Sequence, residues 1–224
     1  MGTGQEQKAA PPLFWKLCVL CLVSGFLSTP FSYFFSGILK LPLYLDTIFN
    51  VAVAFSAGLV PGLLAIFFNY LFNFFQYKQL MSLPLNEVWT MYIFSICMIA
   101  EVVLVCAFHK GIKNQESTFL NKPSLNSFAG TASLLLVLVA IDCIVISVLG
   151  GLIDVARTVL SSSRLYWPED NLKLGLLRNN MSLLWAAILS RIPINIVDRL
   201  VVIFGGYGIS ILYRKWLKAE PWSA

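Results

Sequence analysis

Charged residues are scarce in this chain. Only 12% of its 224 residues are Asp, Glu, Lys or Arg, whereas 58% are hydrophobic, and the mean hydropathy is +0.78. A soluble globular domain carries about 25% charged residues, so this composition excludes an ordinary soluble domain. Several apolar runs exceed the ~18 residues of a membrane-spanning helix and are too long for the strands of a β-barrel. The sequence therefore predicts an all-α integral membrane protein.

Several signatures of chemistry are missing as well. The sequence has no GxxxxGK[ST] motif, so the chain does not hold ATP in a P-loop. Its one histidine, His109, lacks the partners of a metal site or a catalytic triad. The five cysteines lie in apolar runs without a second ligand pair, and no basic surface with interleaved aromatics suits nucleic acid. We expect no metal, no cofactor, no nucleic acid and no enzymatic activity.

Six apolar segments are present. We expect helices over 14–35, 43–57, 61–76, 88–108, 128–152 and 181–213. The stretch "AGLVPG", Ala57 to Gly62, favours a break between the second and third helices, although a kink in one long helix would also explain it. Pro193 predicts a kink in the long last helix. The expected organisation is a tail over 1–13, a six-helix domain over 14–213 with an outer loop over 153–180, and a tail over 214–224.

The basic residues near the helix ends predict the topology. Cytoplasmic loops carry an excess of lysine and arginine. If the second and third helices are separate, one side of the membrane holds Lys8, Lys16, Lys110, Lys113, Lys122, Arg214, Lys215 and Lys218. We therefore expect a multi-pass protein of the bacterial inner membrane with both termini in the cytosol.

Ionisable residues also occur inside the apolar runs: Glu101, Asp142, Arg191, Asp198 and Arg199. Each costs about 2.5–3.5 kcal/mol at the centre of a spanning helix, so these side chains must face the bundle interior or a wet cavity. Counting about 1.5 Å of rise per residue puts Asp142 level with Arg191, and Glu101 level with Asp198 and Arg199. We expect the pairs Asp142–Arg191 and Glu101–Arg199.

Further polar residues lie in the outer half of the expected bundle. Together they predict one outward-facing pocket for a small molecule, formed by Asp46, Asn50, Asn69, Asn73, Asp142, Arg191 and Asn195. Pro193 removes a backbone donor beside Arg191, which is tolerated where the helix lines protein or a cavity. The alternative is that these groups only pair with one another and hold the helices together.

The first expected helix carries a stripe of small residues. Cys21, Gly25 and Ser28 recur at spacings of three and four, together with Cys18 and Ser32. Small residues let two helices approach closely. The stripe indicates either packing within the chain or a contact with a partner subunit.

Two stretches carry a resemblance to a known family: "DTIFNVAVAFSAGLVPGLLA", Asp46 to Ala65, and "SRIPINIVDRLVVIFGGYGISILYRK", Ser190 to Lys215. With six helices and both ends inside, the chain resembles the substrate-binding S component of energy-coupling factor (ECF) transporters. The resemblance implies capture of a micronutrient from outside and energy from a shared transmembrane coupling subunit and two cytosolic ATPases. With a single histidine, an organic cargo is expected.

The same resemblance implies a docking contact on the first helix. The family uses two alanines four residues apart, and the matching positions here are Cys21 with Gly25, or Ser24 with Ser28. Two other function classes stay open. A proton-coupled carrier would use Glu101, Asp142 and Asp198 as a relay, and a membrane sensor or assembly module would need a further output partner.

Overall fold

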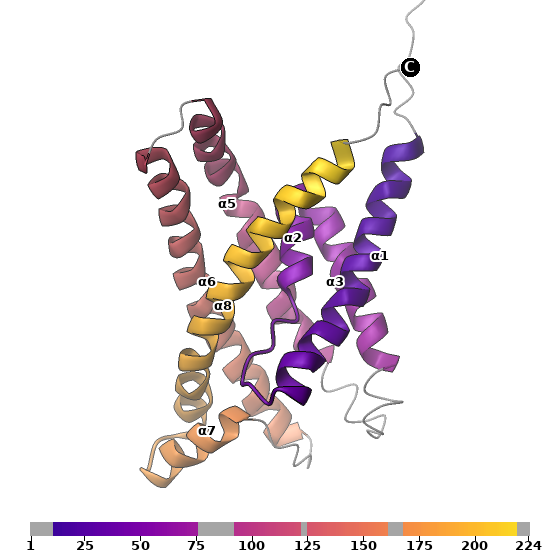
Figure 1. The fold of residues 1–224 in the computed structure, drawn as a ribbon. Helices are drawn as coiled ribbons and strands as arrows, with labels where there is room; N and C mark the ends of the chain where they lie inside the picture. The colour runs from indigo at the N-terminus through magenta and orange to yellow at the C-terminus, as the bar shows by residue number, and fades with distance from the viewer. Residues whose placement is uncertain (1–10, 76–91, 122–124, 161–167, 219–224) are drawn as a thin grey trace, which may run out of the picture.

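The computed structural model describes residues 11–75, 92–121, 125–160 and 168–218 (Figure 1). Within these ranges all regular elements are helices, which confirms the all-α prediction. In chain order they are α1 (Pro11–Tyr33), the π-helical turn η1 (Phe34–Ile38), α2 (Ile48–Ala57), α3 (Leu59–Phe75), α5 (Ser95–Asn121), α6 (Leu125–Leu160), α7 (Pro168–Arg178) and α8 (Leu183–Lys218).

Among the residues that the structure describes, three helical segments are long and apolar enough to cross a membrane: Phe14–Ile38, Ser95–Glu116 and Phe128–Val159. Large apolar side chains such as Val60, Val159 and Phe14 are also widely exposed on the bundle surface. A helix that is apolar on its exposed face suits lipid better than water. These features are those of a membrane protein.

The expected break between the second and third helices is confirmed. Gly58 separates α2 from α3 and has a φ of +91°. Its N–H donates to the carbonyl oxygen of Ala54 at 3.0 Å, which closes the last turn of α2. Glycine is favoured at this position because a side chain would strain a backbone with positive φ.

The helices alternate in direction, so that chain segments distant in sequence meet at each end of the bundle. Figure 1 shows the start of α1, the α2–α3 break, the end of α5, the start of α6 and the end of α8 at the upper end, and α7 at the lower end. The upper end therefore carries Lys16, Lys110, Lys113, Arg214, Lys215 and Lys218. Lys8 and Lys122 lie outside the described residues.

The expected outer loop over 153–180 is wrong. α6 continues to Leu160, and α7 forms a separate helix from Pro168 to Arg178. Proline suits the first turn of a helix because its missing N–H has no partner there in any case. A charged helix of 11 residues has no apolar run to reveal it, so hydropathy alone indicates a loop.

Other boundaries also differ from expectation. The fourth expected helix extends well beyond Phe108, as α5, and residues 88–91 at its expected start lie outside the described residues. α8 continues through Pro193 as one helix of 36 residues. The kink at Pro193 stays a prediction.

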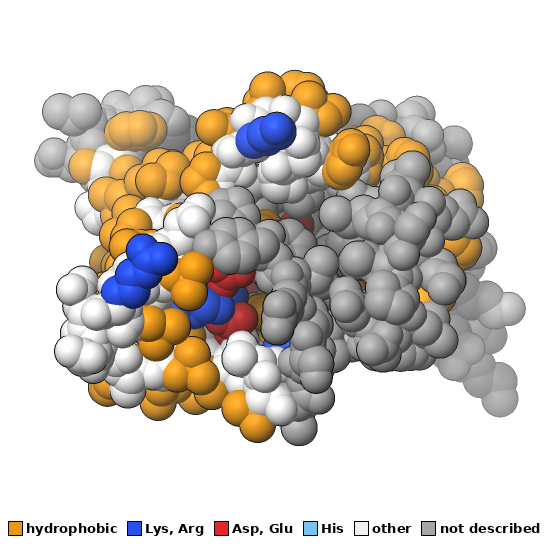
Figure 2. Space-filling view, turned by 90° about the horizontal axis from the view of Figure 1, so that it is seen from below, with side chains coloured by type: hydrophobic (Ala, Val, Ile, Leu, Met, Phe, Trp, Pro, Cys, Tyr) orange, Lys and Arg blue, Asp and Glu red, His pale blue; other side chains and the backbone are white. Residues whose placement is uncertain are grey.

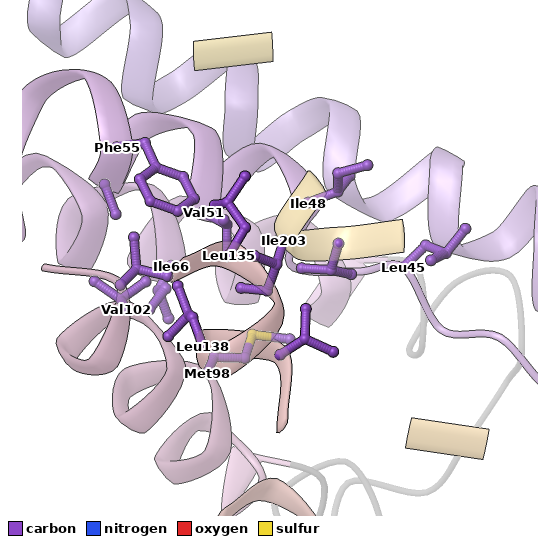
Figure 3. Close-up of a cluster of buried hydrophobic side chains, with 14 of the residues drawn as sticks. Leu45, Ile48, Val51, Phe55, Ile66, Met98, Val102, Leu135, Leu138 and Ile203 are labelled. Carbon is purple, nitrogen blue, oxygen red and sulfur yellow. The ribbon is translucent and has the colours of Figure 1, made fainter. Parts of the chain in front are cut away.

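The core lies where α2, α5, α6 and α8 meet. Five side chains that are at most 2% exposed pack together there: Phe55, Val51, Val102, Leu138 and Ile203 (Figure 3). α8 approaches α2 closely because it presents two glycines: a Cβ on Gly206 would lie 2.7 Å from Val51, and one on Gly205 would lie 2.8 Å from Ile48. Such close packing stabilises helix contacts in lipid, which is itself as apolar as these side chains.

Candidate functional site

Arg199 on α8 is the centre of a buried polar cluster. Its Nη1 donates to Glu101 Oε1 at 2.5 Å and to Thr47 Oγ1 at 3.3 Å, and its Nη2 donates to Asp198 Oδ2. The predicted Glu101–Arg199 pair is therefore confirmed. The side chains of Glu101 and Asp198 are fully buried, and that of Arg199 is 6% exposed. Ions buried this deeply must be paired, because they lose their hydration.

Asp198 also holds the segment that leads into α2. Its Oδ1 accepts the backbone N–H groups of Tyr44 at 2.9 Å and Leu45 at 3.0 Å. These donors stabilise the carboxylate charge, as does the start of a helix nearby. Leu45 has a φ of +46°, an uncommon value for a residue with a branched side chain. The hydrogen bonds to Asp198 hold that backbone in place.

The predicted Asp142–Arg191 pair is wrong. Asp142 is fully buried, and neither of its carboxyl oxygens has a hydrogen-bond donor. Instead the carboxyl group lies against that of Glu101, close enough for a hydrogen bond between the two. An ionised carboxylate can accept hydrogen bonds but cannot donate one. The contact between the two carboxyl groups is therefore a hydrogen bond only when one of them is protonated.

Arg191 belongs to a second charged group at the α7 end. Its Nη2 lies 3.9 Å from Asp154 Oδ1, and its guanidinium lies 5.5 Å from the ring centre of Phe94. Lys173 on α7 lies 2.8 Å from Asp154 Oδ2 and 2.6 Å from Asp170 Oδ1. Four charged side chains from three helices therefore meet here. Arg191 passes beside Gly150 of α6 and reaches Asp154, one helical turn further toward the α7 end.

The position of Lys173 affects its protonation. Burial by itself lowers the pKa of this amine, but the hydrogen bonds to Asp154 and Asp170 outweigh burial and raise the pKa above its ordinary value. Lys173 is therefore charged at neutral pH. It ties α7 to α6 through the Asp154 carboxylate.

Most of the predicted polar residues have partners within the chain. Asn69 Nδ2 donates to the carbonyl of Asp46 at 3.0 Å, Asn73 Oδ1 accepts from Thr29 at 2.9 Å, and Asn195 Nδ2 donates to Ser147 Oγ at 2.9 Å. Asn50, like Asp142, differs: it is fully buried, and neither its amide nitrogen nor its oxygen has a hydrogen-bond partner. These contacts join α3 to the segment before α2, α1 to α3, and α6 to α8, and the single outward-facing pocket stays a prediction.

The face at the α7 end is hollowed. Figure 2 views the molecule from this end and shows acidic and basic side chains gathered in a recess among apolar and uncharged surface. The acid–base group of Asp154, Asp170, Lys173 and Arg191 belongs to this end of the bundle.

The small-residue stripe is not a docking surface in this structure. Cys21, Ser24, Gly25 and Ser28 are all buried. A Cβ on Gly25 would lie 2.7 Å from the backbone nitrogen of Asn69, and Ser24 Oγ donates to the hydroxyl of Tyr213 at 3.0 Å. The stripe packs against α3 and α8, so the alternative of internal packing holds.

Sequence reasoning missed Asp154, Asp170 and Lys173. All three fell in the segment interpreted as an outer loop, where charges are ordinary. The spacing of Asp170 and Lys173 by three residues, which places them on one helix face, was the available signal. Their meeting with Arg191 depends on how α7 folds back onto α8.

The chemistry open to this arrangement is binding of solutes and ions. Among the described residues, no group of three or more His, Cys, Asp and Glu side chains is placed to hold a metal ion. Within the described part of the chain, carboxyl groups outnumber guanidinium groups in the buried cluster: Glu101, Asp142 and Asp198, with Asp46 nearby, surround Arg199. The chain matches no protein-family model, no curated protein and no solved structure.

Proposed function

We propose that the chain is the membrane-embedded substrate-binding subunit of an ECF-type importer. In this proposal α1, α2, α3, α5, α6 and α8 cross a bacterial inner membrane, with both termini in the cytosol. The subunit captures a small polar organic solute, vitamin-like in size, at the α7 end. A coupling subunit in the membrane and two cytosolic ATPases supply the energy, in keeping with a chain that has no P-loop.

One observation supports this proposal most directly: a recess at one end of the bundle contains charges of both signs (Figure 2). Ligand sites of helical bundles lie between the helices and use a few polar groups to orient the ligand. Six basic residues near helix ends lie at the opposite end, whereas Arg157, Lys173 and Arg178 lie at the α7 end, where Lys173 pairs with Asp154 and Asp170. The positive-inside rule favours this distribution if the recess faces outward. Arg191, which is largely buried, offers a cation to an anionic group of the solute.

Purification from native membranes in mild detergent tests the partners. Mass spectrometry of the purified material should identify two ATPases, one coupling subunit and a small organic molecule. Recovery of the chain alone, or with a kinase or an assembly factor, would exclude the importer.

A pair of variants tests the recess. Arg191→Ala should abolish retention of the co-purified solute, whereas Arg178→Ala, which removes an exposed arginine of α7, should leave retention unchanged. Circular dichroism and thermal unfolding of both variants report whether the bundle is intact. Unchanged affinity in Arg191→Ala would refute the role of Arg191.

The second candidate is a proton-coupled carrier. The observation that favours it is the excess of buried carboxyl groups around Arg199. Transport by the purified chain in vesicles, driven by a pH gradient without ATPases, distinguishes this candidate from the importer. An importer subunit alone would show binding without accumulation.

A further inference from the structure

The buried cluster has too little positive charge for its acids. Glu101, Asp142 and Asp198 are fully buried, and Arg199 is the one guanidinium beside them among the described residues. With every group ionised, these four side chains carry a net charge of −2 in a low-dielectric interior, and the nearby carboxyl group of Asp46 adds no positive charge. Unbalanced buried charge costs several kcal/mol per ion, and proteins usually avoid that cost by neutralising a group.

Two of the three acids have partners that stabilise a negative charge. Asp198 accepts two backbone N–H groups and pairs with Arg199, and Glu101 pairs with Arg199 through Oε1. Hydrogen bonds and a cation stabilise these two groups as carboxylates. The charge of Asp142 has no such support, because neither of its oxygens receives a hydrogen bond.

A second observation comes from polar atoms that have no partner. Glu101 Oε2 is buried without a donor, and both amide atoms of Asn50 are buried without partners. Asn50 lies one turn after Thr47, whose hydroxyl accepts from Arg199, and is therefore on the same face of α2 as that contact with the cluster. Arg199 Nε, like Asn50 Nδ2, is a buried donor without an acceptor, whereas Glu101 Oε2 and both oxygens of Asp142 are acceptors without a donor. Between the two carboxyl groups themselves only acceptors face each other as long as both are ionised.

We infer that Glu101 and Asp142 together bind one proton, carried on Asp142 and donated to Glu101, in the interior of the bundle. The proton comes from water, converts the carboxyl contact into a hydrogen bond, and reduces the net charge of the cluster from −2 to −1. Protonation satisfies Glu101 Oε2 as an acceptor. This inference is independent of the proposed importer function.

A proton accounts for the site better than a metal cation does. Calcium takes six to eight oxygen ligands, and Glu101 Oε1 is already hydrogen-bonded to Arg199. Among the described residues, no three acidic or thiol side chains are arranged around a common metal position. The titratable and charged groups that face the pair are Cys97 of α5, Cys143 of α6, Asp198 and Arg199 of α8, and Asp46 before α2.

Infrared spectroscopy of the full chain in lipid nanodiscs tests the proton directly. At neutral pH the protein should show the C=O stretching band of a protonated carboxyl, which shifts in D₂O. The band should disappear in Asp142→Asn and persist in the matched controls Asp46→Asn and Asp154→Asn. Selective ¹³C labelling of aspartate carboxyls shows, without any substitution, that the band belongs to an aspartate and not to a glutamate, and the variants then assign it to one aspartate.

Unfolding measured against pH gives a second readout. A folded state that holds one proton more than the unfolded state loses about tenfold in its folding equilibrium constant per pH unit above the ordinary carboxyl range. Asp142→Asn, whose amide donates in place of the proton, should lose this slope. Absence of the band in the wild type would overturn the inference, as would its loss in Asp46→Asn. Stabilisation by sodium in the wild type but not in Asp142→Asn would show a cation site instead.

Discussion

The carboxylate of Asp198 holds the backbone of Leu45, 153 residues earlier in the chain, through an N–H···Oδ1 hydrogen bond of 3.0 Å. A second bond from Tyr44 at 2.9 Å completes the contact. Asp198 therefore has two roles: it neutralises Arg199 on one side, and it fixes the connector before α2 on the other. The start of α2, including Thr47, is in this way tied to the charged cluster of α8.

This contact predicts that Asp198→Ala releases the connector. Each hydrogen bond to a charged group contributes about 1.5–3 kcal/mol to stability. Leu45 has a positive φ, which is strained for this residue, so its backbone relaxes once the hydrogen bonds are removed. Hydrogen–deuterium exchange should accelerate at the amides of Tyr44 and Leu45. Ser210→Ala, which removes a hydroxyl bonded only within its own helix, serves as control. Unchanged exchange in Asp198→Ala would show that the connector is held by packing alone.

The Glu101–Arg199 ion pair predicts a large loss of stability in Arg199→Gln. Removing one partner of a buried ion pair leaves an uncompensated charge and costs about 3–5 kcal/mol. The free energy of unfolding of each variant can be measured in mixed detergent micelles. The double variant Glu101→Gln/Arg199→Gln should be clearly more stable than the sum of the single effects predicts. Additive losses would mean that the two residues do not interact.

The close approach of α1 and α3 predicts that Gly25→Ala destabilises the bundle. Its new Cβ would lie 2.7 Å from the Asn69 nitrogen and 2.9 Å from the Ala65 oxygen, both backbone atoms that a rotamer change does not move. Overpacking of this kind costs about 1–3 kcal/mol.

Gly208→Ala is the matched control for this substitution. Nothing lies within 4 Å of a Cβ on Gly208, and alanine is favoured over glycine in a helix by about 1 kcal/mol. The Tm should therefore fall for Gly25→Ala and rise for Gly208→Ala. A fall of equal size in both would show that α1 and α3 adjust without cost.

The Lys173 contacts predict how α7 responds to pH. Because the folded pKa of Lys173 is raised, its stabilising effect is fully present below its ordinary value of 10.5 and is lost as pH rises through the folded pKa. Lys173→Met should release α7 at neutral pH, whereas the wild type should release it only in strong alkali. Amide exchange of residues 168–178 measures both. Protection that survives in Lys173→Met would mean that leucine packing alone holds α7.

The sequence by itself determined the helical bundle, the break at Gly58 and the pairing of Glu101 with Arg199. Each rests on a local rule: apolar runs must be helical in lipid, glycine accommodates a positive φ, and the rise per residue places two charges at one depth. Depth along a helix follows from counting residues, so the expected level of Arg199 was correct.

Only the tertiary structure decided the rest. Asp142 and Arg191 were expected at one level, yet Asp142 turns toward Glu101 and Arg191 toward Asp154. The direction in which a side chain points around its helix axis depends on the neighbouring helices that pack there. A long arginine side chain can also contact a residue one helical turn above or below its own level in the bundle. The sequence did not predict α7 or the contacts of Lys173 for the same reason. The charged residues of α7 are typical of an exposed loop, and they become largely buried only because α7 packs against α6 and α8 at the end of the bundle.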